Sequence, residues 1–155
     1  MIETEELKTL IPHRGPMLLL SAIKEYNTEE KTLNAEYHIT RDCLFYDPAI
    51  GGVPAWVAFE FMAQSISSLS GLRSREKGEG PKMGFLLSVS SMKIGIPFFK
   101  EGCTVELRIK ESSRVDQIYN FDGEAFLEGR KVINGRLTIF DADDEQVKLF
   151  MNNYE

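Results

Sequence analysis

The stretch from Pro54 to about Leu72 constrains the fold of this chain more than any other segment. Pro54 suits the first turn of a helix, and a helical pattern continues to about Gly71. Apolar side chains occupy every side of its first half, which therefore shows no polar stripe: Trp56, Val57, Ala58, Phe59, Phe61, Met62 and Ala63. A helix that is apolar all round is buried, so the rest of the chain has to wrap around it.

The segments on either side of this helix favour strands. A short helix is expected over residues 3–10. Strict alternation of apolar and polar residues over 32–39 and 103–110 predicts two half-buried strands. Further strands are expected over 17–26, 85–94, 116–127 and 131–140. Because strands and helices do not alternate after the central helix, the sheet should be mainly antiparallel. A curved antiparallel sheet around one central helix is the α+β arrangement called the hot-dog fold.

Length and composition limit the class of protein. The chain has 155 residues, which favours a single domain over residues 1–141, followed by an acidic, frayed tail over 142–155. A net charge of −6 argues against nucleic-acid binding. The sequence contains no run of 18 apolar residues, which argues against a membrane span, and its acidic start lacks the basic region of a signal peptide. We therefore expect a cytoplasmic protein with an exposed polar loop over 73–83.

The cysteines and histidines narrow the chemistry. Cys43 and Cys103 match no metal-ligand spacing and are expected to be buried thiols in a reducing compartment, so we expect no metal and no cofactor. The chain has two histidines. His38 falls on the polar side of its strand and is expected to be exposed. His13 lies in a stiff loop with two prolines and a glycine, where it is either a catalytic side chain or a structural one.

Glu60 is the candidate acid of the central helix. A carboxylate buried in an apolar helix is costly to ionise, so such a group can exchange a proton near neutral pH as a general acid or base. Gln64 lies one turn further along the same face and is expected to orient Glu60. The alternative is a core glutamate paired with Arg or Lys. No serine-hydrolase elbow, phosphate loop or zinc-protease motif is present in the sequence.

These residues resemble the FabZ and FabA type β-hydroxyacyl-acyl-carrier-protein dehydratases over roughly residues 5–140. Leu10-Ile11-Pro12-His13-Arg14-Gly15-Pro16-Met17 looks like the start of that family. Pro54-Ala55-Trp56 and Glu60-Phe61-Met62-Ala63-Gln64 are similar to its central-helix motif, and Gly84-Phe85-Leu86-Leu87, Pro97 and Gly102 fall where it has a strand and a turn. The resemblance is closest to the ApeP-like branch, associated with aryl polyene pigments.

One position departs from the FabZ and FabA pattern. The catalytic histidine of that pattern corresponds to Tyr46, the residue 14 positions before Glu60, so His-Phe-Pro is replaced by Tyr46-Asp47-Pro48. A phenol has an ordinary pKa of about 10 and is a poor base. Either His13 supplies the imidazole, as the ApeP-like pattern suggests, or the chain lacks this dehydratase chemistry.

The resemblance implies dehydration of 3-hydroxyacyl thioesters carried on the phosphopantetheine arm of acyl carrier protein, in fatty acid or aryl polyene synthesis. It implies His13 as base, Glu60 as acid, the backbone N–H of Ala55 as oxyanion donor, and Gln64 as the residue that holds Glu60. Tyr46, Pro54 and Trp56 would line the site. Such proteins form dimers through their sheet edges, so a homodimer or larger oligomer is expected.

Three other functions remain open at this point. A hot-dog thioesterase would use the same helix acid to activate water and would release a free acid. A non-catalytic subunit could pair with an active dehydratase, which the Tyr46 replacement favours. A wholly structural protein would need another explanation for the isolated acid on the helix.

Overall fold

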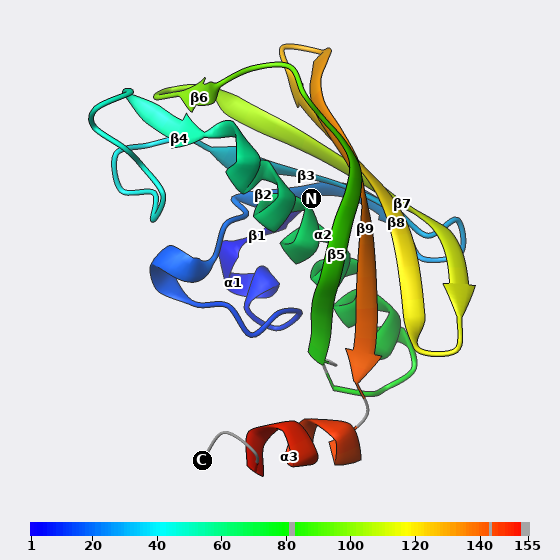
Figure 1. Cartoon of the computed structure of the whole chain (residues 1–155). Helices are drawn as coiled ribbons and strands as arrows, with labels where there is room; N and C mark the ends of the chain where they lie inside the picture. Colours follow the sequence, from blue (N-terminus) through cyan, green and yellow to red (C-terminus); the bar gives the residue numbers. More distant parts are fainter. Residues whose placement is uncertain (81–82, 143, 153–155) are drawn as a thin grey trace.

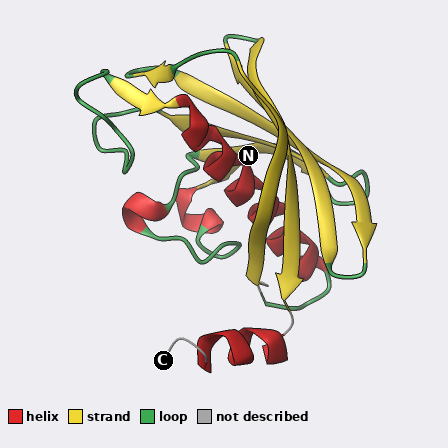
Figure 2. Cartoon of the chain, viewed as in Figure 1, coloured by secondary structure: helices red, strands yellow, loops and turns green. Residues whose placement is uncertain are grey.

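A curved sheet wraps one long helix in the computed structural model, which describes residues 1–80, 83–142 and 144–152 (Figures 1 and 2). Every adjacent pair of strands in this seven-stranded sheet is antiparallel. The strand order across it is β1 (Ile2–Glu3), β2 (Ala22–Asn27), β3 (Thr32–His38), β7 (Thr104–Val115), β8 (Ile118–Leu127), β9 (Arg130–Ala142) and β5 (Met83–Ile94). The predicted α+β hot-dog fold is confirmed.

The central helix begins with a 3₁₀ turn, η2 (Ala55–Val57), and continues as α2 (Ala58–Glu76). Figure 1 shows α2 lying across the concave side of the sheet. Phe61 is fully buried and lies between two aromatic rings, with ring centroids 4.7 Å from Tyr37 and 6.2 Å from Phe99. Burial of such large apolar side chains drives the sheet to close over the helix.

The alternating segments behave as predicted. On the side facing the helix, β3 buries Leu33, Ala35 and Tyr37, and β7 buries Val105, Leu107 and Ile109. The side chains between them point to the outer face of the sheet. The tight turn joining β8 to β9 uses Glu128 and Gly129, both with positive φ, which is the geometry of a two-residue hairpin turn.

The central helix is longer than predicted. Gly71 does not end it; α2 continues to Glu76, so the first residues of the predicted exposed loop are helical. A Cβ atom at Gly71 would lie 2.4 Å from the carbonyl oxygen of Leu10. This glycine therefore allows the N-terminal segment to approach the helix, which a reading of glycine as a helix terminator misses.

The N-terminal segment also differs from the prediction. Its helix, α1, covers only Thr4–Leu7, and a 3₁₀ turn, η1, occupies Gly15–Met17. The expected strand over 17–26 starts only at Ala22, because the backbone of residues 17–19 bonds to the side chain of Gln64 on α2 instead of to a neighbouring strand.

Several smaller elements were not predicted, among them a second sheet and a C-terminal helix. Strands β4 (Gly52–Pro54) and β6 (Phe98–Lys100) form a two-stranded antiparallel sheet beside the start of α2. The acidic tail, expected to be frayed, forms α3 (Asp144–Asn152), which Figure 1 shows beyond the end of β9. Among the described residues, no helix is both long enough and apolar enough to cross a membrane.

Candidate active site

One half-buried face of α2 lines a cavity of about 280 Å³. Glu60, Ala63, Ser67, Ser70 and Arg73 are the half-buried residues in the first four turns of α2, and their spacing of three or four places them on one face. All five line the cavity. The prediction of a helix that is apolar all round is therefore wrong. It was based on residues 56–63, whereas the polar stripe begins at Glu60 and lies mostly after residue 63.

His13 reaches the same cavity from the N-terminal loop. Arg14 holds the segment before it, because its guanidinium donates to the carbonyl oxygens of Ile11 and His13 at 2.8 Å and of Lys8 at 2.7 Å. The side chains of Leu10 and Ile11 are buried just before it. These contacts fix the backbone conformation at His13. The structure thus brings the side chains of His13 and Glu60 to one cavity within a single chain.

The surroundings of His13 keep its ring neutral. Burial lowers the pKa of His13, the nearby Glu60 carboxylate raises it, and Arg14 lowers it again, with a net lowering from the ordinary value of 6.5. Nδ1 of His13 is buried without a hydrogen-bond partner in the described part of the chain. A neutral imidazole at physiological pH is the form that accepts a proton.

Gln64 has a different contact from the one predicted. Its side-chain oxygen accepts a hydrogen bond from the backbone N–H of Leu19 at 2.7 Å, and its amide nitrogen donates to the carbonyl oxygen of Met17 at 2.8 Å. Both ends of the buried amide therefore hold the N-terminal segment. Gln64 ties the His13 loop to the helix that carries Glu60.

The predicted oxyanion donor is already occupied. The backbone N–H of Ala55 donates to the carbonyl oxygen of Pro97 at 3.1 Å, in the contact between η2 and the segment before β6. Ala55 is buried and does not line the cavity. The structure thus corrects this prediction: the Ala55 N–H serves to fix the start of the central helix.

Tyr46, Pro54 and Trp56 do not line this cavity either. The Tyr46 hydroxyl donates to Glu101 at 3.3 Å, and partial desolvation, followed by the Glu101 charge, raises the pKa of the phenol. The Trp56 side chain is exposed, with its ring 5.9 Å from that of Phe45. Because its pKa is raised, the Tyr46 hydroxyl keeps its proton at neutral pH. It is therefore not suited to act as the base.

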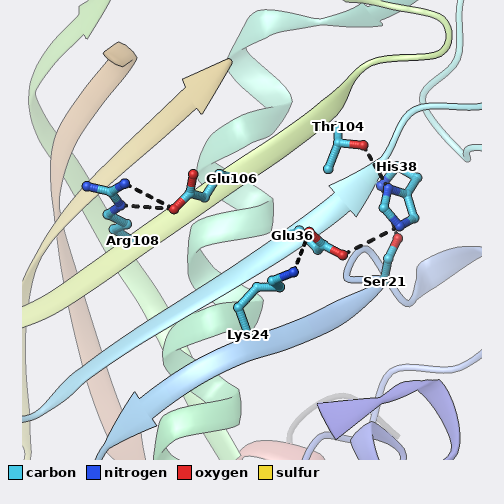
Figure 3. A network of polar contacts seen from close by, with 7 residues as sticks. All are labelled: Ser21, Lys24, Glu36, His38, Thr104, Glu106 and Arg108. Carbon is cyan, nitrogen blue, oxygen red and sulfur yellow. Dashed lines mark hydrogen bonds and ion pairs between the residues drawn. The ribbon is translucent and has the colours of Figure 1, made fainter. Parts of the chain in front are cut away.

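His38 is exposed, as predicted, and lies on the far side of β3 from α2 (Figure 3). Its ring contacts Thr104 at 2.9 Å and Glu36 at 3.6 Å, and Glu36 also pairs with Lys24. This outer network is separate from the cavity.

The cysteines and the acidic residues give no sign of a metal centre. Cys43 and Cys103 are half-buried free thiols, and burial raises the pKa of Cys103. Within the described ranges, no group of three or more His, Cys, Asp or Glu side chains is arranged to hold a metal ion.

The sequence reading missed Arg14 and the far half of the cavity wall. Arg14 stands inside the loop motif, but its bonds to three carbonyl groups depend on how that loop folds. Ser67, Ser70 and Arg73 carry a clear signal, because their spacing from Glu60 continues one helical face.

Comparisons with known proteins identify the family of this chain. The profile of the ApeP-like family, described as ApeP dehydratase, matches residues 5–151. The 3-hydroxyacyl-acyl-carrier-protein dehydratase FabZ of Colwellia psychrerythraea is 30% identical over 139 residues, covering 88% of this chain and 91% of that protein.

Solved structures show the same fold. The dehydratase heterocomplex ApeI:P from Xenorhabdus doucetiae matches with a TM-score of 0.84 at 24% identity, covering 94% of this chain and 97% of that one. A hypothetical thioesterase from Streptococcus pneumoniae, solved with coenzyme A, matches with a TM-score of 0.59 at 12% identity, covering 77% and 84%. The family match over nearly the whole chain decides between these activities: the chain belongs to the ApeP-like family of hot-dog β-hydroxyacyl-acyl-carrier-protein dehydratases.

Proposed function

We propose that His13 and Glu60 remove water from a 3-hydroxyacyl thioester presented by acyl carrier protein. The observation that carries this proposal is the placement of one neutral imidazole and one carboxyl group on the wall of the same cavity. Dehydration needs a base for the proton at carbon 2 and an acid for the hydroxyl leaving carbon 3, and these two side chains supply both.

The proposed reaction balances its protons within the pair. In the form of the pair that reacts, Glu60 carries a proton and the imidazole of His13 is neutral. His13 takes the proton from carbon 2, the carbon–oxygen bond at carbon 3 breaks, and Glu60 gives its proton to the departing hydroxyl as water leaves. The products are a trans-2-enoyl thioester and water. A proton then passes from the imidazolium of His13 to the carboxylate of Glu60, which restores the starting state. The mechanism calls for no metal and no cofactor, since the phosphopantetheine arm of the carrier holds the substrate.

We propose that a second chain completes the cavity. Strand β5 is the edge of the sheet, and Gly84, Phe85 and Leu86 on this strand line the cavity. The same edge exposes Leu87, Met92 and Ile94. An exposed apolar edge strand readily pairs with another chain, and pairing here would extend the sheet and cover the cavity. A homodimer is the simplest such assembly.

A heterodimer is the second candidate assembly. Tyr46 occupies the place of the usual histidine, and a structural neighbour is the dehydratase heterocomplex ApeI:P. In that arrangement a second hot-dog chain would supply part of the active site. The free thiols agree with a reducing compartment, and we propose the cytoplasm.

Product analysis tests the proposal. The purified chain is incubated with 3-hydroxyacyl-acyl carrier protein, and the thioesters are separated by mass. We expect a product lighter by one water that remains attached to the carrier. Release of free acid would indicate a thioesterase. Turnover only after co-expression with a second hot-dog protein would indicate the heterodimer.

A further inference from the structure

The cavity extends well beyond the two catalytic side chains. Its wall follows α2 from Glu60 through Ser67 and Ser70 to Arg73 and Ser74. At 1.5 Å per residue, Arg73 stands about 20 Å along the helix from Glu60. An extended carbon chain of roughly 16 atoms spans that distance, taking the usual C–C bond length and angle. The far end of the cavity is therefore where the tail of a long acyl chain would lie.

Arg73 has an unused donor at this far end. One guanidinium nitrogen, Nη1, contacts Glu111 at 3.3 Å. The other, Nη2, is buried and has no hydrogen-bond partner within the described ranges. A buried polar group without a partner costs free energy, so such groups usually have a partner in the working state.

The local charge balance favours an electron-rich partner. The Glu111 carboxylate is buried, and it pairs with Lys31 at 2.9 Å as well as with Arg73. One negative charge therefore faces two positive charges. Within this cluster of three residues Glu111 does not neutralise both cations, so Nη2 favours an oxygen atom that carries partial or full negative charge.

Two neighbouring polar groups at this end already have partners. The Tyr119 hydroxyl donates to Asp141 at 3.3 Å. Arg114 lies over the Tyr119 ring at 4.5 Å and donates to the carbonyl oxygen of Asp116 at 3.4 Å. Among the described residues that line this end of the cavity, Arg73 is the one with a buried donor that has no hydrogen-bond partner.

We propose that Arg73 binds a hydrogen-bond-accepting oxygen at the distal end of the acyl chain. The substrate class is a long 3-hydroxyacyl thioester whose tail ends in a hydroxyl, carbonyl or carboxyl group. This inference rests on the proposed function. A methyl-ended chain would leave Nη2 unpaired and would place apolar carbon against Ser67, Ser70 and Ser74, whereas an oxygen-ended chain satisfies the donor.

Matched substrates test this specificity. Trans-2-enoyl pantetheine thioesters of about 16 carbons are prepared with a methyl, a hydroxyl or a carboxyl end, and their hydration is measured beside that of the short crotonyl thioester. We expect kcat/KM for at least one oxygen-ended chain to exceed that for the methyl-ended chain by about tenfold or more. If only the carboxyl-ended chain is preferred over the methyl-ended one, the group that Arg73 binds is an anion. If the hydroxyl-ended chain is preferred equally, that group is a neutral acceptor.

Variants assign the preference to Arg73. Arg73→Met should bring the ratio of oxygen-ended to methyl-ended kcat/KM close to one. Both values are divided by the crotonyl rate of the same variant, so that a general change in activity cancels out of the comparison. Arg75→Met is the matched control, since Arg75 is exposed, pairs with Glu6 and does not line the cavity. If Arg73→Met does not fold, the double variant Arg73→Met/Glu111→Gln is used in its place, because it also removes the buried Glu111 charge, which would keep only Lys31 as a partner.

Binding separates this inference from the proposed function. Pantetheine amides with the same three tails cannot react, and calorimetry measures their affinities directly. Turnover of crotonyl thioester with equal rates and affinities for all three tails overturns the inference and leaves dehydration standing. Preferential binding that Arg73→Met removes, in a protein without turnover, supports the inference and contradicts the proposed function.

Discussion

The surroundings of His13 predict how its charge depends on pH. Burial outweighs the attraction of Glu60 and lowers the pKa of His13 below 6.5. The base is therefore neutral at physiological pH. Since the unfolded chain binds the proton more tightly, His13 reduces the free energy of unfolding as the pH falls from 6.5 through the lowered pKa.

We expect the NMR titration midpoint of His13 to lie below 6.5, the ordinary value for histidine. Glu60→Gln should lower it further, because this substitution removes the carboxylate that raises the pKa of His13. His38→Gln assigns the signals without touching the cavity, since His38 lies on the outer face of the sheet. An unchanged midpoint in Glu60→Gln would show that the two groups do not interact.

Tyr46 should contribute little to the chemistry. Tyr46→Phe removes only the hydroxyl that contacts Glu101, and we expect kcat to stay within about tenfold of the wild type, or about 1.4 kcal/mol. Steady-state kinetics on an enoyl thioester measure this directly. A loss of several orders of magnitude would place the phenol in the active site and remove the argument for His13.

At the scale of elements, the strands were the easiest part to predict. Residues such as Leu33, Leu107 and Ile109 alternate with polar neighbours because one face of the sheet meets α2 and the other meets solvent. The end of α2 was not predictable in this way. Gly71 is a glycine because the Leu10 backbone lies against it, and that contact joins segments far apart in the sequence.

The placement of the two candidate side chains was predictable from the sequence, but the contacts that support them were not. His13 and Glu60 stand out by residue type and position, and both reach the cavity. The partners of Gln64 and of the Ala55 N–H depend on tertiary contacts that carry no local pattern. The expected roles of those two residues therefore had to be replaced.

Gln64 is a positioning residue in this account, and its substitution should affect both stability and catalysis. Gln64→Met keeps the volume but leaves the Leu19 N–H and the Met17 carbonyl without partners, at a cost of about 1–3 kcal/mol in unfolding free energy. The loosened loop should also lower kcat and shift the acid limb of its pH profile. Urea unfolding and pH-dependent kinetics measure the two effects.

Ser65→Ala is the control for Gln64. Ser65 is buried in the same helix, but its hydroxyl donates to the carbonyl of Phe61 within α2 and does not contact the loop. We expect a small loss of stability and an unchanged pH profile. If both substitutions leave the profile unchanged, Gln64 only stabilises the fold.

At the scale of the whole molecule, the main feature is the edge strand β5, which pairs with β9 on one side and with no strand of the sheet on the other. Leu87 and Met92 are more than half exposed, at 56% and 55%, on the strand whose residues Gly84, Phe85 and Leu86 line the cavity. The opposite edge is the two-residue strand β1, which is too short to support a long pairing. Assembly through β5 would therefore bury apolar surface and enclose the substrate together.

The double substitution Leu87→Lys/Met92→Lys should dissociate the assembly. Light scattering should show a dimer for the wild type at micromolar concentration and a folded monomer for this variant, with activity lost together with the dimer. Tyr26→Lys, an exposed position on β2, should leave the mass unchanged. A wild-type monomer with full activity would contradict the proposed enclosure.

The most direct test of the central claim is the hydration of crotonyl thioester, the reverse reaction, by wild type, His13→Ala, Glu60→Gln and the double variant. We expect each single substitution to reduce kcat by about 10²- to 10⁴-fold. Folding should be unaffected, because Glu60→Gln keeps the shape of the side chain. The double variant should be little worse than either single one, since the two groups act as a unit. Wild-type turnover that persists in both single variants would contradict the assignment of His13 and Glu60.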